Sequence, residues 1–153
     1  MECPYCHSLQ TEVKNSRSTL KETQIWRRRK CLRCLAVFTT HEAVDLSHLV
    51  VIKKSGVSEV FARSKLYSGI YGATIGSKNV NKEKEVEKIT REVEREILFL
   101  KKKRIYSSEI ADIILNKLKK NHSATFLRFL AYCKGITNES QMKRELNKYV
   151  FDN

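Results

Sequence analysis

Two Cys-x2-Cys pairs carry the most specific chemistry in this sequence. Cys3 pairs with Cys6, and Cys31 pairs with Cys34 after a gap of 24 residues. Each pair can close a tight turn that points two thiolates at one place, and two such turns supply four sulfur atoms about 2.3 Å from a zinc ion. Because cysteine would fill every coordination position, none is left for water. The spacing therefore predicts a structural zinc site and not a catalytic one.

Other uses of these cysteines are weaker predictions. Disulfide bonds belong to secreted proteins, and Met1-Glu2-Cys3-Pro4 has no basic patch followed by an apolar stretch, so we expect no secretion signal. A thioredoxin-like redox site would have one Cys-x2-Cys beside a strand and a helix. His7, His41 and His48 could in principle replace a cysteine as ligand, but the symmetric pattern favours four cysteines.

A basic run leads directly into the second cysteine pair. It reads Trp26-Arg27-Arg28-Arg29-Lys30, and Arg33 stands between the last two cysteines. An isolated charge run is most simply a solvated surface. Here a metal would hold the run rigidly, and rigid guanidinium groups can grip phosphates bidentately or reach guanine edges. Together with the neighbouring tryptophan, this favours nucleic-acid binding.

The overall charge agrees with a polyanionic partner. The chain has 153 residues and a net charge of +13, of which +3 falls in residues 1–46 and +10 in the remainder. Such a surface attracts nucleic acid, nucleotides or acidic lipid, although a solvated basic face is the simpler alternative. The longest aliphatic run is Leu49–Ile52, far short of the about 20 apolar residues that span a membrane, so we expect no membrane helix.

Two regions of different composition must position these groups. Residues 1–46 hold four of the five cysteines, and we place a short linker near Val44–His48. Val50 to Phe61 predicts a β-hairpin that turns at Lys53–Gly56, with Gly56 at positive φ. Apolar spacing then predicts helices that bury one stripe each, with Cys133 as a buried thiol. The stripes are Leu66, Ile70 and Ala73; Val86, Ile89, Val93, Ile97 and Leu100; Ile110, Ile113, Ile114 and Leu118; Phe126, Phe129, Leu130 and Cys133; and Met142, Leu146 and Tyr149 or Val150.

Short motifs along both regions match a known family. Cys-Pro-Tyr-Cys at 3–6, Asn-Ser-Arg at 15–17, Arg-Arg-Arg-Lys-Cys at 27–31, Cys34 and Phe-Thr-Thr-His-Glu at 38–42 resemble the zinc ribbon of NrdR-type transcriptional repressors. Val-Ile-Lys-Lys-Ser-Gly at 51–56, then Glu59, Phe61 and Lys65-Leu66, are similar to the opening of that family's ATP-cone. Glu109–Asp112 and Arg128-Phe129 fall where the family has similar helices. The resemblance covers about residues 1–136.

The resemblance implies an α+β fold in three parts. Residues 1–46 would form a small β zinc ribbon that binds DNA, residues 47–137 a mostly helical ATP-cone opened by a β-hairpin, and residues 138–153 a C-terminal helical tail. The implied function is a nucleotide-responsive repressor that binds operator DNA of ribonucleotide reductase genes. ATP or dATP, with magnesium left open as a companion ion, would control oligomerisation and thereby DNA binding. The implied setting is a homo-oligomer in the bacterial cytoplasm, at the nucleoid and not at a membrane.

The same resemblance implies three sets of site residues. The zinc ligands would be Cys3, Cys6, Cys31 and Cys34. The DNA-binding residues would be Arg17, Arg27, Arg28 and Arg29. The nucleotide-binding residues would be Val51, Lys53, Lys54, Glu59, Lys65 and Leu66. The three lysines could meet a triphosphate, although by itself Lys53-Lys54 is most simply an exposed turn, and the sequence has no Walker loop.

The chain departs from the family pattern at four positions. Lys54 stands where the family usually has arginine, which makes a stronger bidentate contact with phosphate. Ala62 stands where an aspartate usually caps the first helix, so the cap is missing or has moved to Ser64. Phe126 and Cys133 stand where the family favours tyrosine. These departures bear on nucleotide preference and on oligomer switching.

Two other functional classes compete with a repressor. One is a zinc-ribbon accessory protein, associated with RNA or polymerase, whose helical part only docks partners. The other is an enzyme, but the sequence shows no convincing paired-carboxylate, Cys–His or Ser–His arrangement and no open metal site, so we expect none. The sequence does not determine the operator, the choice between ATP and dATP as the repressing ligand, or the number of subunits.

Overall fold

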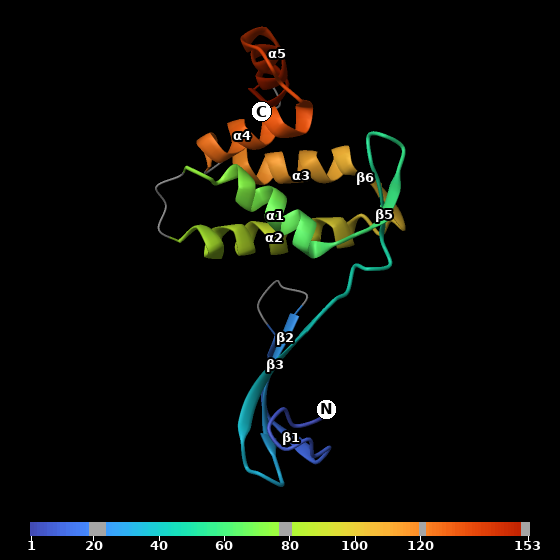
Figure 1. Cartoon of the computed structure of the whole chain (residues 1–153), viewed down its shortest axis with the longest axis vertical. Helices are drawn as coiled ribbons and strands as arrows, with labels where there is room; N and C mark the ends of the chain where they lie inside the picture. The colour runs from blue at the N-terminus through green and yellow to red at the C-terminus, as the bar shows by residue number, and fades with distance from the viewer. Residues whose placement is uncertain (19–23, 77–80, 120–121, 151–153) are drawn as a thin grey trace. The chain divides into compact units, whose positions relative to one another are not determined.

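The chain forms two compact units, Met1–Asp45 and Leu46–Asn153. The computed structural model describes residues 1–18, 24–76, 81–119 and 122–150. Each unit has its own three-stranded sheet, and the described helices all belong to the second unit (Figure 1). None of these helices combines the length and apolar character that a membrane crossing needs.

The first unit is an antiparallel sheet with almost no buried side chains. Its order is β1-β2-β3, and the ladder between β1 and β2 contains a bulge between Val13 and Asn15. In the described part of this unit only Cys3 and Cys31 are buried. Strand pairing and the cysteine cluster must therefore do what a hydrophobic core does in larger domains. The strands are β1 (Thr11–Ser18), β2 (Gln24–Cys31) and β3 (Val37–Ala43).

The second unit opens with the predicted hairpin. β4 (Val50–Ile52) pairs antiparallel with β5 (Ser58–Val60), and Gly56 has a φ of 84° in the turn, so both predictions are confirmed. A third strand, β6 (Arg104–Tyr106), pairs parallel with β4. The sequence did not predict β6, because three residues are too few to show an alternating pattern.

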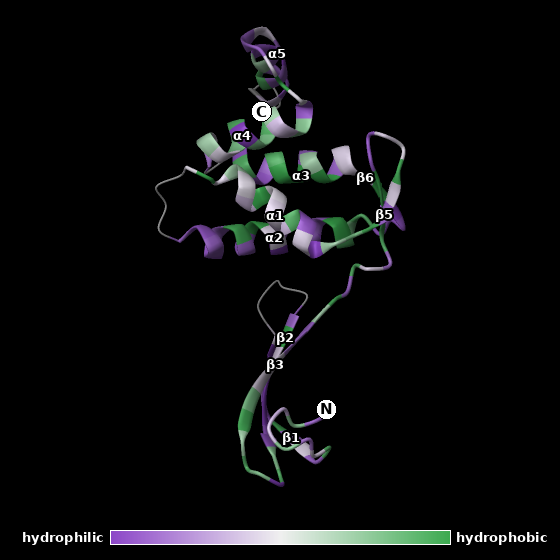
Figure 2. Ribbon diagram, viewed as in Figure 1, coloured by the Kyte–Doolittle hydropathy of each residue, from purple (hydrophilic) through white to green (hydrophobic). Residues whose placement is uncertain are grey.

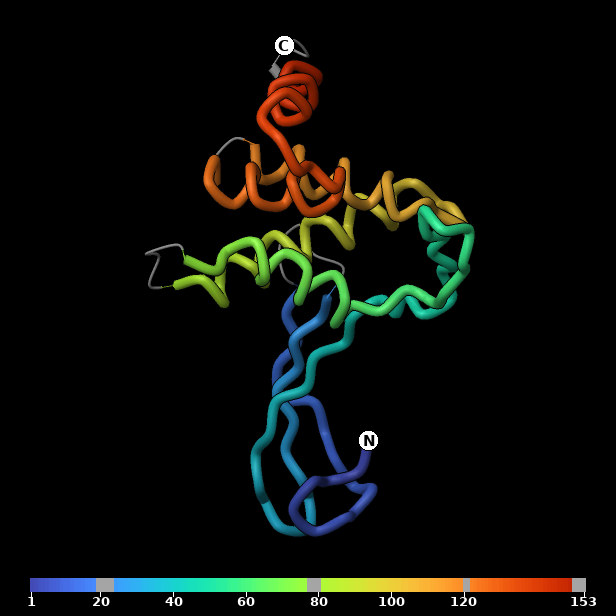
Figure 3. Tube along the Cα trace, turned by 45° about the horizontal axis from the view of Figure 1, so that its top comes forward, coloured from blue at the N-terminus to red at the C-terminus, as the bar shows by residue number. Residues whose placement is uncertain are grey.

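Five helices complete the described part of the second unit. Helices α1 and α2 lie side by side, and α3 packs against both α2 and α4 (Figures 1 and 3). Figure 2 shows hydrophobic and hydrophilic residues interspersed along these helices, as expected when each buries one face. The helices are α1 (Arg63–Ala73), α2 (Lys82–Phe99), α3 (Ser107–Lys119), α4 (Ser123–Lys134) and α5 (Glu139–Val150).

Most of the predicted stripes form one hydrophobic core. Leu100 was predicted in the α2 stripe but is 42% exposed, because α2 ends one residue earlier. In α3, Ile110 and Ile113 are only partly buried, whereas Leu115, which was not predicted, is fully buried. Cys133 was predicted to be a buried thiol, but it is only half-buried because it borders a cavity. The predicted stripe residues that are buried are Leu66, Ile70, Ala73, Val86, Ile89, Val93, Ile97, Ile114, Leu118, Phe126, Phe129 and Leu130.

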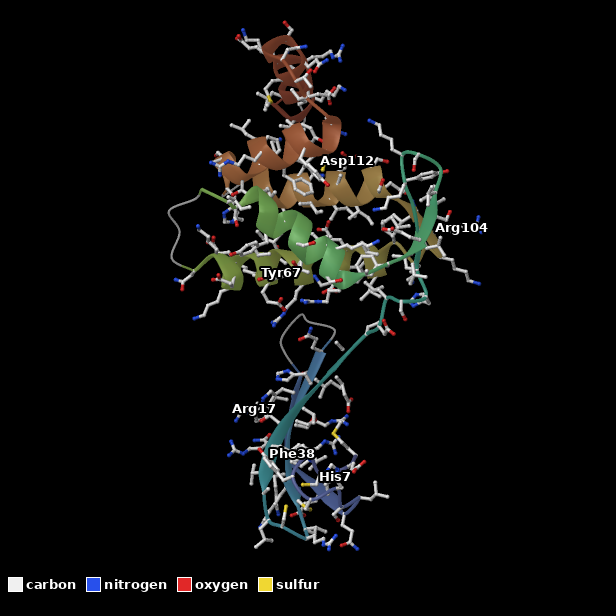
Figure 4. All side chains as sticks on the ribbon, in the orientation of Figure 1. His7, Arg17, Phe38, Tyr67, Arg104 and Asp112 are labelled. Carbon is white, nitrogen blue, oxygen red and sulfur yellow. The ribbon has the colours of Figure 1, made fainter. Side chains whose placement is uncertain are left out.

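The C-terminal helix α5 packs on the other helices of the second unit. Its Met142, Leu146 and Tyr149 contact the core and are partly buried. The ring of Tyr149 meets that of Phe126 edge-on, with centroids 5.5 Å apart. The Tyr149 hydroxyl also donates a hydrogen bond to Asp112 of α3, the residue labelled in Figure 4. Helix α5 is therefore attached by both apolar and polar contacts.

Candidate functional site

The four cysteines come together at one end of the first unit's sheet. The Sγ atoms of Cys3 and Cys34 are 3.7 Å apart, those of Cys6 and Cys31 are 3.6 Å apart, and all four lie within 4.8 Å of one another. A tetrahedral site with Zn–S distances of about 2.3 Å has sulfur–sulfur edges of about 3.8 Å. The four thiols can therefore bind one zinc ion.

The two Cys-x2-Cys loops have the same backbone arrangement. The N–H of Cys3 donates to the carbonyl of Ser8, and the N–H of Cys31 to the carbonyl of Ala36, each over 2.9 Å and each spanning five residues. In both loops the residue after the second cysteine has a left-handed backbone, with φ of 57° and 62°. These residues are His7 and Leu35. Two copies of one turn therefore present their sulfurs to a shared point, as the spacing predicted.

The pKa values of two of the four thiols are shifted, and in opposite directions. The N–H of Cys34 donates to Sγ of Cys31 over 3.5 Å and lowers the pKa of the Cys31 thiol to about 6. The N–H of Ala36 acts to lower the pKa of the Cys34 thiol. Burial and the neighbouring thiols act in the opposite direction and outweigh it, so that the pKa rises from 9.0 to about 12. Four thiolates so close together need a compensating charge, and Zn²⁺ supplies it because it binds the deprotonated form.

The nearby histidines do not join this cluster. His7 is exposed, and its Nδ1 lies 2.8 Å from Oε1 of Glu2. Among the described residues, the group that could hold a metal ion consists of the four cysteines, without His41 or His48. The donor set that the structure offers is therefore sulfur alone.

Strand register divides the four candidate DNA-binding arginines between two faces of the sheet. Arg17 lies opposite Trp26, and Arg28 is two residues further along β2. Directly opposed residues and alternate residues of a strand share a face, so Arg17 and Arg28 lie together. Arg27 and Arg29 alternate with Arg28 and lie on the other face. Arg17 and Cys31 lie toward opposite ends of the β1–β2 ladder, and Figure 4 labels Arg17 away from His7.

The two faces differ in ion pairing. Arg27 is paired with the Glu42 carboxylate, and Arg29 lies 3.9 Å from the same oxygen. Their side chains are only 30% and 13% exposed. Arg17 and Arg28 are exposed and have no ion pair within the part of the chain that the structure describes. An approaching anion would therefore meet Arg17 and Arg28 without displacing a protein carboxylate.

A cavity of about 740 Å³ lies in the second unit and is bordered by the hairpin, α1, α3 and α4. This volume suits a nucleotide-sized ligand. Lys54 is exposed on the turn and does not line the cavity. The other residues predicted to bind nucleotide do line it, namely Val51, Lys53, Glu59, Lys65 and Leu66.

Glu59 joins the two lysines of this cavity. Its carboxylate oxygens lie 2.9 Å from Nζ of Lys53 and 2.7 Å from Nζ of Lys65. The hydrogen bonds from Lys65 and then Lys53 lower the pKa of the Glu59 carboxyl. The cluster therefore keeps a net positive charge with its ammonium groups already placed, and a polyphosphate would compete with Glu59 for them.

Helix α1 begins at the cavity without a side-chain cap. Ala62 occupies the N-cap position with an extended backbone and makes no side-chain capping bond, and Ser64 is already inside the helix. The cap is thus missing and has not moved to Ser64. Ala62 and Lys65 both line the cavity, and the N–H of Lys65 donates to the carbonyl of Ala62 over 3.0 Å.

Helix α4 supplies four cavity residues, of which Phe129 and Cys133 were predicted as core, Arg128 was given as a family match and Tyr132 was missed. Phe129 and Cys133 lie on its buried stripe, whereas Arg128 and Tyr132 lie beside that stripe, one turn apart. Tyr132 is 80% exposed although it lines the cavity. In the sequence, these two residues could have been found as a cation and a tyrosine spaced i, i+4 beside the apolar stripe.

Comparison with known proteins gives one matching family model for each unit. The family model described as the N-terminal domain of NrdR-like transcriptional repressors, a zinc ribbon, matches residues 1–42. The ATP cone domain model matches residues 49–134. ATP-cone domains bind ATP or dATP as a regulatory ligand.

Curated relatives match over nearly the full length. A protein named transcriptional repressor NrdR from Finegoldia magna is 32% identical, and the match covers 97% of each chain. Its namesake from Thermoanaerobacter pseudethanolicus is 34% identical over 100% of this chain and 96% of its own. The namesake from Petrotoga mobilis is 36% identical over 88% of both chains. None of these names denotes an enzyme. With its cysteine cluster, basic sheet and nucleotide-sized cavity, this chain belongs to the NrdR family of transcriptional repressors.

Proposed function

We propose that this chain represses ribonucleotide reductase genes in response to adenine nucleotides. The observation that carries the proposal is the presence, on one chain, of a four-cysteine ribbon with exposed arginines and a separate cavity whose lysines are already placed for phosphate. The first unit would bind operator DNA and the second would sense ATP or dATP. A bacterial repressor acts in the cytoplasm at the nucleoid, and this location is part of the proposal.

The DNA-binding role is supported by the zinc cluster and the sheet register. Four zinc-bound sulfurs would fix the end of β2 and thereby the arginines that precede Cys31. We assign the first contact with DNA to the exposed face that carries Arg17 and Arg28. Arg27 and Arg29 would reach phosphate when it replaces their partner Glu42, because a phosphate makes equally strong charge-assisted bonds.

The nucleotide-binding role is supported by the chemistry of the cavity. Lys53 and Lys65 would meet the triphosphate, with magnesium left open as a companion ion. Val51 and Leu66 would cover the base, and Glu59 would accept from the adenine amino group or a ribose hydroxyl. Lys54, at the exposed turn, would contribute only long-range attraction.

The proposal also requires assembly of several copies. A three-stranded ribbon reads a short half-site, so useful specificity needs at least two ribbons on one DNA molecule. Nucleotide binding in the second unit would change how copies associate and thereby how many ribbons reach the operator. We therefore propose a homo-oligomer whose size depends on whether ATP or dATP is bound.

The test combines mass, metal content and DNA binding of the same samples. Zinc-loaded protein is mixed with ATP, dATP or no nucleotide, its mass is measured, and it is titrated with a ribonucleotide reductase promoter duplex or a scrambled duplex. We expect one zinc per chain, a nucleotide-dependent mass and preference for the promoter. Arg28→Ala should lower DNA affinity and leave ATP binding unchanged.

Other outcomes would favour the competing functions. Equal affinity for promoter, scrambled DNA and RNA would favour an accessory ribbon protein. Steady turnover of ATP by the pure protein would favour an enzyme. If Arg28→Ala left promoter affinity untouched, the first unit would not be the DNA reader.

A further inference from the structure

The second unit carries a basic loop that neither the ribbon nor the cavity uses. It runs over Lys101–Arg104, from the residues after α2 to the first residue of β6, and all four residues are exposed. Two exposed aromatic residues flank it: Phe99 at the end of α2 is 72% exposed and Tyr106 at the end of β6 is 57% exposed. None of these residues lines the cavity. We call the segment Lys101–Arg104 the basic loop.

The positive charge of the basic loop is largely uncompensated. Lys102 is paired with Glu109. In the described ranges of the chain, no carboxylate pairs with Lys101, Lys103 or Arg104. Elsewhere in the unit several exposed cations do have carboxylate partners, such as Arg63 with Glu87. Three free cations within one short segment raise the local potential far more than the same charges dispersed over the surface.

The fold holds this loop in place at both ends. The N–H of Lys101 donates to the carbonyl of Leu98 over 3.1 Å, which ties the loop to the last turn of α2. The carbonyl of Lys103 accepts from the N–H of Val50 over 3.0 Å, and Ile105 is buried in the core. The cations are thus presented from a short, anchored segment, so little conformational entropy is lost when they bind.

The strand to which the basic loop is hydrogen-bonded begins close along the chain to the first unit. The loop's backbone partner Val50 follows Asp45, the last residue of the first unit, by only five residues. The outward side chain of Arg104 lies at the periphery of the second unit, on the sheet that starts with Val50 (Figure 4). DNA held by the first unit is therefore tethered to the strand on which the basic loop is anchored.

We propose that the basic loop binds the phosphate backbone of the duplex that the first unit reads, adding affinity that does not depend on sequence. This inference rests on the proposed operator binding. Lysine ammonium groups are point charges suited to phosphate, and contacts to the phosphate backbone carry no sequence information directly. Anionic lipid offers similar phosphates, but the short tether to a DNA-binding unit favours DNA.

The test compares two triple variants of the full chain with equal loss of charge. K101Q/K103Q/R104Q removes the unpaired cations of the basic loop. K84Q/K88Q/R144Q removes two exposed lysines and one exposed arginine from α2 and α5 of the same unit. Each zinc-loaded protein is titrated with the promoter duplex and with a scrambled duplex at a series of NaCl concentrations. Circular dichroism and ATP binding check that each variant folds.

We expect the loop variant to lose about tenfold or more in affinity for both duplexes alike. The slope of log K against log salt should become shallower by roughly 2 to 3, about one for each phosphate that the variant no longer neutralises. The control variant should keep the wild-type slope. If the wild-type protein bound the promoter and the scrambled duplex equally well, operator binding would be refuted. The difference in slope between wild type and loop variant on the scrambled duplex would still show whether the basic loop contacts phosphate.

Three results would overturn the inference. In the first, the loop variant keeps the wild-type slope. In the second, the control variant loses as much affinity as the loop variant, which would mean that the loss depends only on the net charge of the protein. The third concerns vesicles of phosphatidylcholine with phosphatidylserine. If the loop variant lost binding to these vesicles and kept its binding to duplex DNA, the loop would be a lipid site.

Discussion

The hydroxyl of Tyr149 in α5 donates a hydrogen bond to Oδ1 of Asp112 in α3 over 3.1 Å. The same carboxylate oxygen lies 3.4 Å from Nζ of Lys134 at the end of α4. One side chain of α3 therefore connects to both following helices. This places the C-terminal helix in the same polar network as α4, which lines the cavity of the second unit.

Removal of that hydroxyl should loosen α5 without disturbing the core. Tyr149→Phe keeps the ring against Phe126 and removes one hydrogen bond to a charged group that is partly exposed. We expect the free energy of unfolding to fall by about 1 kcal/mol, measured by urea denaturation. Tyr132→Phe is the matched control, since Tyr132 is 80% exposed and has no hydrogen bond to its hydroxyl among the described residues. Equal destabilisation in both variants would contradict the assigned role.

Stability should fall at high pH partly through Cys133. Burial raises the pKa of the Cys133 thiol from about 9.0 to about 11. Between these values the unfolded chain loses the thiol proton and the folded chain keeps it, so the thiol's contribution is complete below pH 9 and is lost as pH rises to 11. Because the thiol is partly exposed, we expect the loss to be about 1 kcal/mol.

The pH effect can be isolated by comparison with Cys133→Ala. Urea unfolding of wild type and variant at pH 8 and pH 11 gives the difference that belongs to this thiol. The variant should lose less stability than wild type over this range. Identical pH profiles would show that the thiol ionises equally in the folded and unfolded chain.

Zinc removal should unfold the first unit and leave the second intact. In the described part of the first unit only Cys3 and Cys31 are buried, and zinc binding contributes on the order of 10 kcal/mol to the folding of such ribbons. Trp26 is the single tryptophan of the sequence and lies on β2, so its fluorescence reports on this unit alone. A chelator should shift the Trp26 emission to the red, while the helical circular dichroism signal and ATP binding persist. Disappearance of the helical signal at the same chelator concentration would contradict this independence.

Two lysines of the hairpin region should differ in their effect on nucleotide binding. Lys65 lines the cavity and contacts Glu59, whereas Lys54 lies outside the lining. We expect Lys65→Ala to weaken ATP binding about tenfold or more, because it removes a charge-assisted contact, and Lys54→Ala to change it less than about threefold. Isothermal titration with ATP and dATP measures both. A greater effect from Lys54→Ala would mean that the turn closes over the nucleotide.

Much of the candidate site was predictable because it depends on local patterns. The Cys-x2-Cys spacing alone predicts the paired loops, and Lys53–Gly56 predicts the hairpin turn, since both depend on residues close in sequence. Strand β6 and Leu115 were missed for the opposite reason. A three-residue strand forms only because β4 lies beside it, and the buried side of α3 is chosen by α2 and α4.

The sequence by itself determined the zinc-binding pattern, the charge of both units and the family to which the chain belongs. Only the tertiary structure decided which arginines share a face, that Glu59 joins Lys53 to Lys65, and that Lys54 lies outside the cavity. These relationships depend on strand register and on packing between segments distant in sequence. A one-residue shift of register moves every side chain of a strand to the other face, and no local pattern fixes that choice.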